Sequence, residues 1–133
     1  MNEYLKGWLQ KANSDYKILE LLVNSKSDLV TDGICFHSQQ GVEKLLKAFL
    51  LSNDKKFPET HNLDLLQKIC VQLDTEFNKF DFQTLGLFAV QIRYGNELYF
   101  PSDEIALNTY NIAVEVKDFV FEKLNVNEDD LKL

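Results

Sequence analysis

The sequence predicts an all-α protein, an up-and-down bundle of about five helices with mainly antiparallel neighbours. Long segments carry apolar residues at steps of three and four, and no segment shows the apolar–polar alternation of a strand. Proline, glycine and cap residues divide these segments with short connections. The chain has 133 residues, enough for one hydrophobic core. We expect one domain over residues 1–125 and an acidic, flexible tail at 126–133.

The first two helices are the longest and most regular in pattern. The first is predicted from Glu3 to Asn24, with its charged residues, Asp15 among them, mostly off the apolar face. That face holds Tyr4, Trp8, Ala12, Tyr16, Leu19 and Val23. The second is predicted from Leu29 to Ser52, with Asp28 as its N-cap. Its apolar positions are Ile34, Ser38, Val42, Leu45 and Phe49.

Three shorter segments complete the predicted bundle. Pro58 marks a loop, after which Thr60 and Asn62 can cap a third helix over residues 63–73. A fourth helix is predicted over residues 75–94, with a seam of Phe82, Leu85, Ala89 and Ile92 and a stop at Gly95 and Asn96. The last helix follows Pro101, with Ser102 at its cap, and reaches about residue 125.

Composition excludes several classes of function. The net charge of −7 opposes sequence-independent binding to nucleic acid, which needs clustered cations. The start of the chain resembles no secretion leader, and no apolar run reaches the length of a membrane span, so we expect a cytoplasmic protein. Cys35 and Cys70 stand apart from each other and from histidine, which indicates core residues and no zinc site. No metal or cofactor motif is present, and we expect none bound.

Four polar residues of the second helix form the first candidate ligand-binding site. At about 100° per residue they share one narrow sector beside the apolar stripe: His37, Gln40, Lys44 and Lys47. This sector could hold a polar ligand or pair with a neighbouring helix. The alternative is a solvated helix flank.

The only arginine of the chain marks the second candidate. Arg93 lies in the stretch IRYGNELYFP, with Tyr94 beside it. Its planar fork of donors suits a phosphate or a carboxylate, which makes both residues candidates for ligand contact. Alternatively Arg93 is structural and pairs with Glu97 or Asp103.

Two predicted helices carry apolar residues opposite their main apolar faces. Phe36 lies opposite Ile34, and Leu87 and Tyr94 lie roughly opposite Leu85. Because such second faces favour contact with another subunit, we expect a homodimer through Phe36, Leu87 and Tyr94.

Several motifs, in order, resemble the HEPN family of small helical domains, named for nucleotide binding in higher eukaryotes and prokaryotes. They are CFHSQQGVEKLLKAFLL, FPETHNLDLL, the IRYG segment and a helix that opens with acids at SDEIAL. The resemblance implies a bundle that dimerises and brings polar residues of two subunits to a shared cleft. Many such proteins bind a minimal nucleotidyltransferase, and some are toxins or metal-independent ribonucleases.

The ribonuclease members of that family use an arginine followed, four to six residues later, by a histidine. Arg93 could match the arginine, but the histidine positions hold Leu98, Tyr99 and Phe100. Tyrosine, with a pKa of about 10, is a poor proton acceptor at neutral pH. The resemblance therefore implies a non-catalytic, dimeric module that binds a nucleotide, a nucleotidyltransferase partner in a toxin–antitoxin-like pair, or both.

Two alternatives remain at the level of sequence. A divergent ribonuclease toxin would need His37 or His61 near Arg93, whereas His61 is expected to support the turn before the third helix. An oligomeric scaffold would use Arg93 only for structure.

Overall fold

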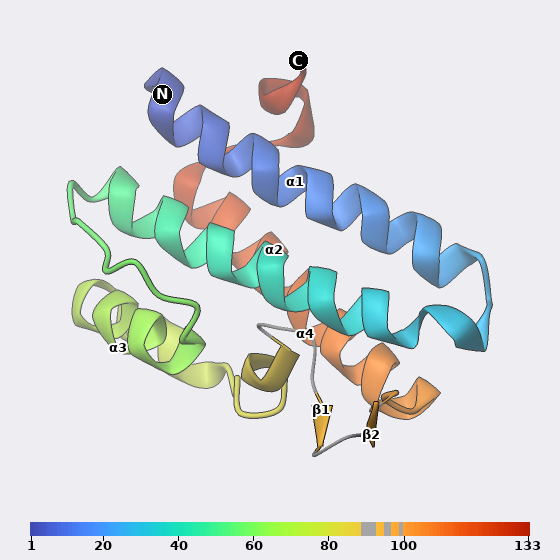
Figure 1. The fold of residues 1–133 in the computed structure, drawn as a ribbon. Helices are drawn as coiled ribbons and strands as arrows, with labels where there is room; N and C mark the ends of the chain where they lie inside the picture. The colour runs from blue at the N-terminus through green and yellow to red at the C-terminus, as the bar shows by residue number, and fades with distance from the viewer. Residues whose placement is uncertain (89–92, 95–96, 99) are drawn as a thin grey trace.

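The computed structural model describes residues 1–88, 93–94, 97–98 and 100–133. Over these residues the chain forms four α-helices, shown in Figure 1: α1 Glu3–Asn24, α2 Thr31–Ser52, α3 Leu63–Leu73 and α4 Asp103–Leu124. Short 3-10 helices precede α2, follow α3 and end the chain. The all-α class is confirmed, with four α-helices described where about five are predicted.

Helix α2 lies at the centre of the molecule and packs against α1, α3 and α4 (Figure 1). Fourteen of its 22 residues are buried. Gly41 lets α1 approach closely, because a Cβ there would lie 2.8 Å from Cε2 of Tyr16. The Tyr16 hydroxyl donates a 2.6 Å hydrogen bond to the carbonyl of Ala113 in α4, and burial raises its pKa well above the ordinary value. Tyr16 thus joins three helices at one point.

The helix directions agree with the prediction in part. Helices α1 and α2 are antiparallel, as expected from their short connection (Figure 1). However, α3 runs parallel to α2. The His61 carbonyl, just before α3, accepts from Gln39, whereas Cys70, near the end of α3, lies against the carbonyl of the later residue Leu46. Helix α4 also starts beside the start of α2. The prediction of mainly antiparallel neighbours is wrong here, because the connections before α3 and α4 are long enough to bring the chain back.

Over its described residues, 75–88 and 93–94, the predicted fourth helix is not present. The segment instead contains the 3-10 helices η2 Thr75–Lys79 and η3 Leu85–Phe88, and then a two-stranded antiparallel hairpin, β1 Arg93–Tyr94 and β2 Glu97–Leu98. The side chains of Asp74 and Asp81 accept bonds from backbone N–H groups two residues ahead, which competes with helix formation. Ala89, Ile92, Gly95 and Asn96 lie outside the described residues.

Five large apolar residues of that segment are nevertheless buried: Phe77, Phe80, Phe82, Leu85 and Phe88. Phe77 packs between Phe49 and Phe119, at ring-centroid distances of 4.6 and 4.9 Å. The Gln67 amide donates to the carbonyl oxygens of Phe77 and Phe80 at 2.8 and 2.7 Å, replacing the bonds that a helix would supply. The core therefore needs the apolar side chains of this segment but not a regular helix.

The helix caps are partly as predicted. Asn62 caps α3 and Ser102 caps α4 through their side-chain oxygens, and Thr60 accepts from the Asn62 N–H in the turn before α3. The prediction for Asp28 is wrong: it is the first residue of η1 Asp28–Val30, which Ser27 caps. Helix α2 then starts without a side-chain cap at Val30.

The C-terminal residues differ from the flexible tail that the sequence predicts. They form the 3-10 helix η4 Glu128–Leu131, and Leu131 is buried. The Glu128 carboxylate accepts from the Lys117 and Lys17 amines at 2.7 and 2.9 Å. These bonds, with Lys117 the stronger contributor, lower the pKa of Glu128 to about 2. One buried leucine and one shared carboxylate thus attach the end of the chain to α1 and α4.

The two cysteines are buried and unpaired, as predicted. Burial raises the pKa of Cys35, and it raises that of Cys70 to about 12. Neither thiol is therefore poised for reaction. Across the described residues, no helix combines the length and apolar character needed to cross a bilayer.

Candidate functional site

A buried carboxylate organises the polar face between α1 and α2. Asp15 of α1 is only 5% exposed. Its two oxygens contact His37 Nδ1 at 2.8 Å and Lys44 Nζ at 2.6 Å, both from α2. Because a carboxylate can only accept, His37 carries its proton on Nδ1 in this contact. The prediction that Asp15 lies off the apolar face is wrong. Asp15 follows Trp8 by seven residues, so the two side chains point within about 20° of each other on α1.

A second buried carboxylate comes from α2 itself and lies between His37 and Lys44 in the sequence. Glu43 is 3% exposed and contacts Lys47 Nζ at 3.0 Å, His61 Nδ1 at 2.8 Å and Gln39 Nε2 at 3.2 Å. His61 therefore ties the turn before α3 to α2, the supporting role expected from the sequence.

Lys47 is enclosed by these groups. It is 6% exposed, and its amine also lies 5.6 Å from the ring centre of Trp8 and 5.3 Å from that of Phe57. An ammonium in this position stabilises the packing of α1 and the loop after α2 through cation–π attraction. Lys47 is thus placed as a structural residue rather than as an open ligand contact.

The predicted polar sector is therefore divided by burial. His37, Gln40 and Lys44 are partly exposed, whereas Lys47 is buried. Gln40 joins the Glu43 network, since its amide donates to the Gln39 side-chain oxygen at 2.6 Å and the Gln39 amide donates to Glu43. The spacing of α2 indicated these four residues, but Asp15 and Glu43, the carboxylates at the centres of the two networks, were not predicted as site residues.

A surface groove adjoins this polar face through Lys44. Its walls come from the first three turns of α1 and from α2, and its volume is about 470 Å³. It is lined by Glu3, Tyr4, Gly7, Trp8, Lys11 and Lys44. The sequence predicts Tyr4 and Trp8 on the apolar face of the first helix, but Tyr4 is exposed and Trp8 is only partly buried. The groove was therefore not predicted.

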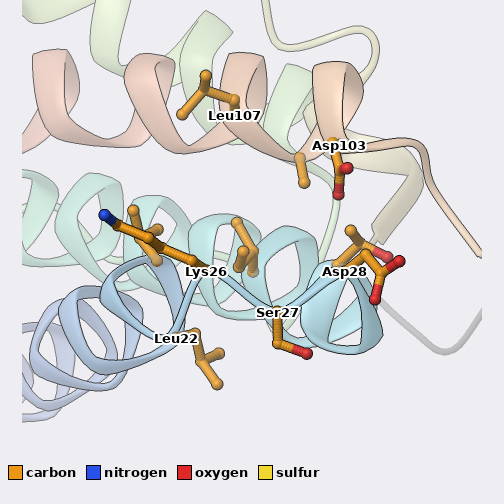
Figure 2. Close-up of a pocket in the computed structure, with 10 residues that line it drawn as sticks. Leu22, Lys26, Ser27, Asp28, Asp103 and Leu107 are labelled. Atoms are coloured by element: carbon orange, nitrogen blue, oxygen red, sulfur yellow. The ribbon is translucent and has the colours of Figure 1, made fainter.

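A second hollow lies at the other end of α1, between η1 and the starts of α2 and α4. Its volume is about 500 Å³. Figure 2 shows the Asp28 and Asp103 carboxylates on one side of it and the Lys26 amine on the other. A neighbouring hollow of about 460 Å³ shares Asp28 and Asp103. Large apolar side chains are exposed at each hollow: Leu107 at the hollow of Figure 2, and Leu29 and Phe100 at its neighbour.

The structure places the remaining predicted residues on other parts of the molecule. Arg93 and Tyr94 form β1, with Arg93 opposite Leu98 and Tyr94 opposite Glu97; their side chains lie outside what the structure describes. The prediction that a helix extends to residue 94 and includes Arg93 is therefore wrong. Phe36 and Leu87 are both exposed, as expected for apolar residues on second faces.

The fold and the site together define a class: a small all-α domain with a fixed polar network on its central helix. A family model, the HEPN domain, matches residues 5–124. The chain therefore belongs to the HEPN family, whose domains are generally nucleotide-binding or ribonuclease-like. Searches of curated proteins and of solved structures gave no match.

Proposed function

We propose that this HEPN protein is a dimeric, non-catalytic binding module that holds a nucleotide on the polar face between α1 and α2. The observation that supports this best is the pairing of His37 and Lys44 with the buried Asp15. The pairing fixes partly exposed donors in one geometry before a ligand arrives, which lowers the entropic cost of binding. Lys44 also borders a groove large enough for a small molecule.

Thermal unfolding with a panel of nucleotides tests this proposal. A ligand at 100 times its Kd that binds only the folded chain adds about 2.7 kcal/mol, which raises Tm measurably. We expect the shift in the wild-type protein and a smaller one in Lys44→Met. If no nucleotide shifts Tm, the nucleotide-binding proposal fails.

Arg93 is proposed as a further phosphate contact of this module. A lysine cannot reproduce the planar fork of arginine, so Arg93→Lys should lose most nucleotide affinity. Equal affinity of the two proteins would leave Arg93 a structural role, as in the scaffold alternative.

The non-catalytic character follows from the incomplete ribonuclease signature. Both histidines already bond a buried carboxylate through Nδ1, and residues 98–100 supply no histidine after Arg93. We expect no metal-independent RNA cleavage. Cleavage abolished by Arg93→Ala and by replacement of His37 or His61 would establish the ribonuclease alternative instead.

Dimerisation is supported by the exposed apolar residues Phe36 and Leu87. A charge at the centre of an apolar contact is costly, so Leu87→Glu should shift the protein toward the mass of a single 15.4 kDa chain. Leu73→Glu, at an exposed leucine of α3, is the control. Light scattering that gives one monomer mass for all three proteins would refute the dimer.

Docking of a minimal nucleotidyltransferase, as in a toxin–antitoxin-like pair, is the second candidate function. The hollow of Figure 2 supports it, because apolar Leu107 is exposed beside Asp28 and Asp103. Among the described residues, neither carboxylate forms an ion pair. This surface suits a partner that presents basic and apolar side chains.

A coexpressed minimal nucleotidyltransferase provides the test of this second function. We expect a complex in size-exclusion chromatography that weakens with salt and is lost in Leu107→Asp. Leu65→Asp, at an exposed leucine of α3, should leave it intact. A complex that survives Leu107→Asp would exclude this surface as the docking site.

A further inference from the structure

We propose that the groove at the start of α1 binds the base of a nucleoside phosphate, stacked on Trp8 and Tyr4, with Lys11 and Lys44 directed to the phosphate. This rests on the proposed nucleotide-binding function and names a subsite for it. Within one chain the subsite, at the start of α1, lies far from β1 (Figure 1), so the proposed Arg93 contact would reach this phosphate from the second chain of the dimer.

The aromatic wall of the groove is held in place from the protein side. Trp8 meets Phe57 edge to face at 5.3 Å between ring centroids, and the Lys47 amine lies over the indole. The indole is therefore fixed before a ligand arrives and loses little freedom on binding. Tyr4, one helical turn earlier, is largely exposed. Base stacking on such rings contributes about 1–3 kcal/mol per base.

Gly7 lines the same groove, and the space beside it is open. A Cβ at this position would meet no atom within 4 Å, so close packing does not require glycine here. Glycine inside a helix costs about 0.5–1 kcal/mol relative to alanine. A residue that weakens α1 and leaves room in a groove is consistent with a ligand that occupies that room.

The charges of the groove give the ligand a direction. Glu3 lies at one end, and Lys11, about 12 Å further along the helix axis, lies with Lys44 at the other. Lys44 is paired with Asp15, whereas Lys11 forms no ion pair among the described residues. A phosphate is therefore favoured at the lysine end, and the base lies over the rings toward Glu3.

The lone tryptophan of the chain makes the test direct, because Trp8 is the only source of indole fluorescence. The full chain is titrated with adenosine 5′-monophosphate, adenosine and inorganic phosphate. We expect saturable quenching by the nucleotide, weaker quenching by adenosine and none by phosphate.

Gly7→Leu, which fills the groove, should weaken nucleotide binding at least tenfold while Tm is unchanged or raised. Lys11→Met should weaken nucleotide binding several-fold and change adenosine binding little. Lys6→Met is the control.

The outcomes separate the subsite from the proposed function. If nucleotides raise Tm but leave Trp8 fluorescence and the Gly7→Leu affinity unchanged, the subsite is wrong and nucleotide binding elsewhere stands. If nucleotides change neither Tm nor fluorescence, both proposals fail. Fluorescence that responds to protein concentration but not to nucleotide would overturn the subsite in favour of a second copy of the chain in the groove.

Discussion

Asp15 and Glu43 are both buried carboxylates that hold a lysine and a histidine, but their surroundings differ. The partners of Asp15, His37 and Lys44, are partly exposed, and Lys44 borders a groove. Glu43 holds Lys47, which is closed in by aromatic rings, and ties down the turn before α3 through His61. The same chemistry thus stabilises the interior at Glu43 and positions surface donors at Asp15.

Removal of the charge of Glu43 should have the largest effect on stability. Glu43→Gln leaves the Lys47 ammonium buried without its counter-ion, and breaking such a pair typically costs about 3–5 kcal/mol. Urea unfolding measures the loss, and Glu76→Gln, at an exposed pair with Lys123, should change stability by about 0–1 kcal/mol. A similar small loss for both variants would show that Lys47 reaches water.

The matching change at Asp15 should cost less stability and more binding. In Asp15→Asn, His37 and Lys44 can turn to water, so we expect a loss of about 1.5–3 kcal/mol, the value of hydrogen bonds to a charged group. Because the donors are no longer held, nucleotide affinity should fall as well. Urea unfolding and calorimetric titration measure the two effects. A loss as large as that of Glu43→Gln, with binding intact, would remove the difference between the two carboxylates.

The two lysines offer a sharper form of the same comparison. Lys44→Met should weaken nucleotide binding about five- to tenfold, equal to about 1–1.4 kcal/mol, with a small change in stability. Lys47→Met should reduce stability, because Glu43 loses its charged partner, and should leave the affinity of the folded protein nearly unchanged. If Lys47→Met weakens nucleotide binding and Lys44→Met does not, the nucleotide-binding site lies beside Glu43 and not beside Asp15.

Much of the fold could be predicted from the sequence, because α1, α3 and α4 follow regular apolar spacing and recognisable caps. The segment after α3 could not, since its apolar spacing suits a helix while Asp74, Asp81 and Gln67 satisfy the backbone in other ways. The polar sector of α2 was visible in the spacing. Its burial pattern was not, because Lys47 is covered by Trp8 from α1 and by Phe57 from the loop after α2.

The groove shows the same limit of sequence reasoning. Tyr4 and Trp8 share the apolar stripe of α1, but α2 ends up covering only part of that stripe, which no pattern within α1 specifies. A charged residue aligned with Trp8, as Asp15 is, was the available signal that the stripe meets a polar partner.

Glu128, a third carboxylate shared by two cations, should show the smallest effect, because its side chain is 44% exposed. Lys117 and Lys17 lower its folded pKa from 4.5 to about 2. Its contribution is therefore complete above the unfolded pKa and is lost as the pH falls from about 4.5 toward 2. Solvent screening limits it to below about 1 kcal/mol. The difference in unfolding free energy between the wild type and Glu128→Gln should be smaller at pH 3 than at pH 6. A difference that is constant with pH would mean that η4 is held by Leu131 and not by this carboxylate.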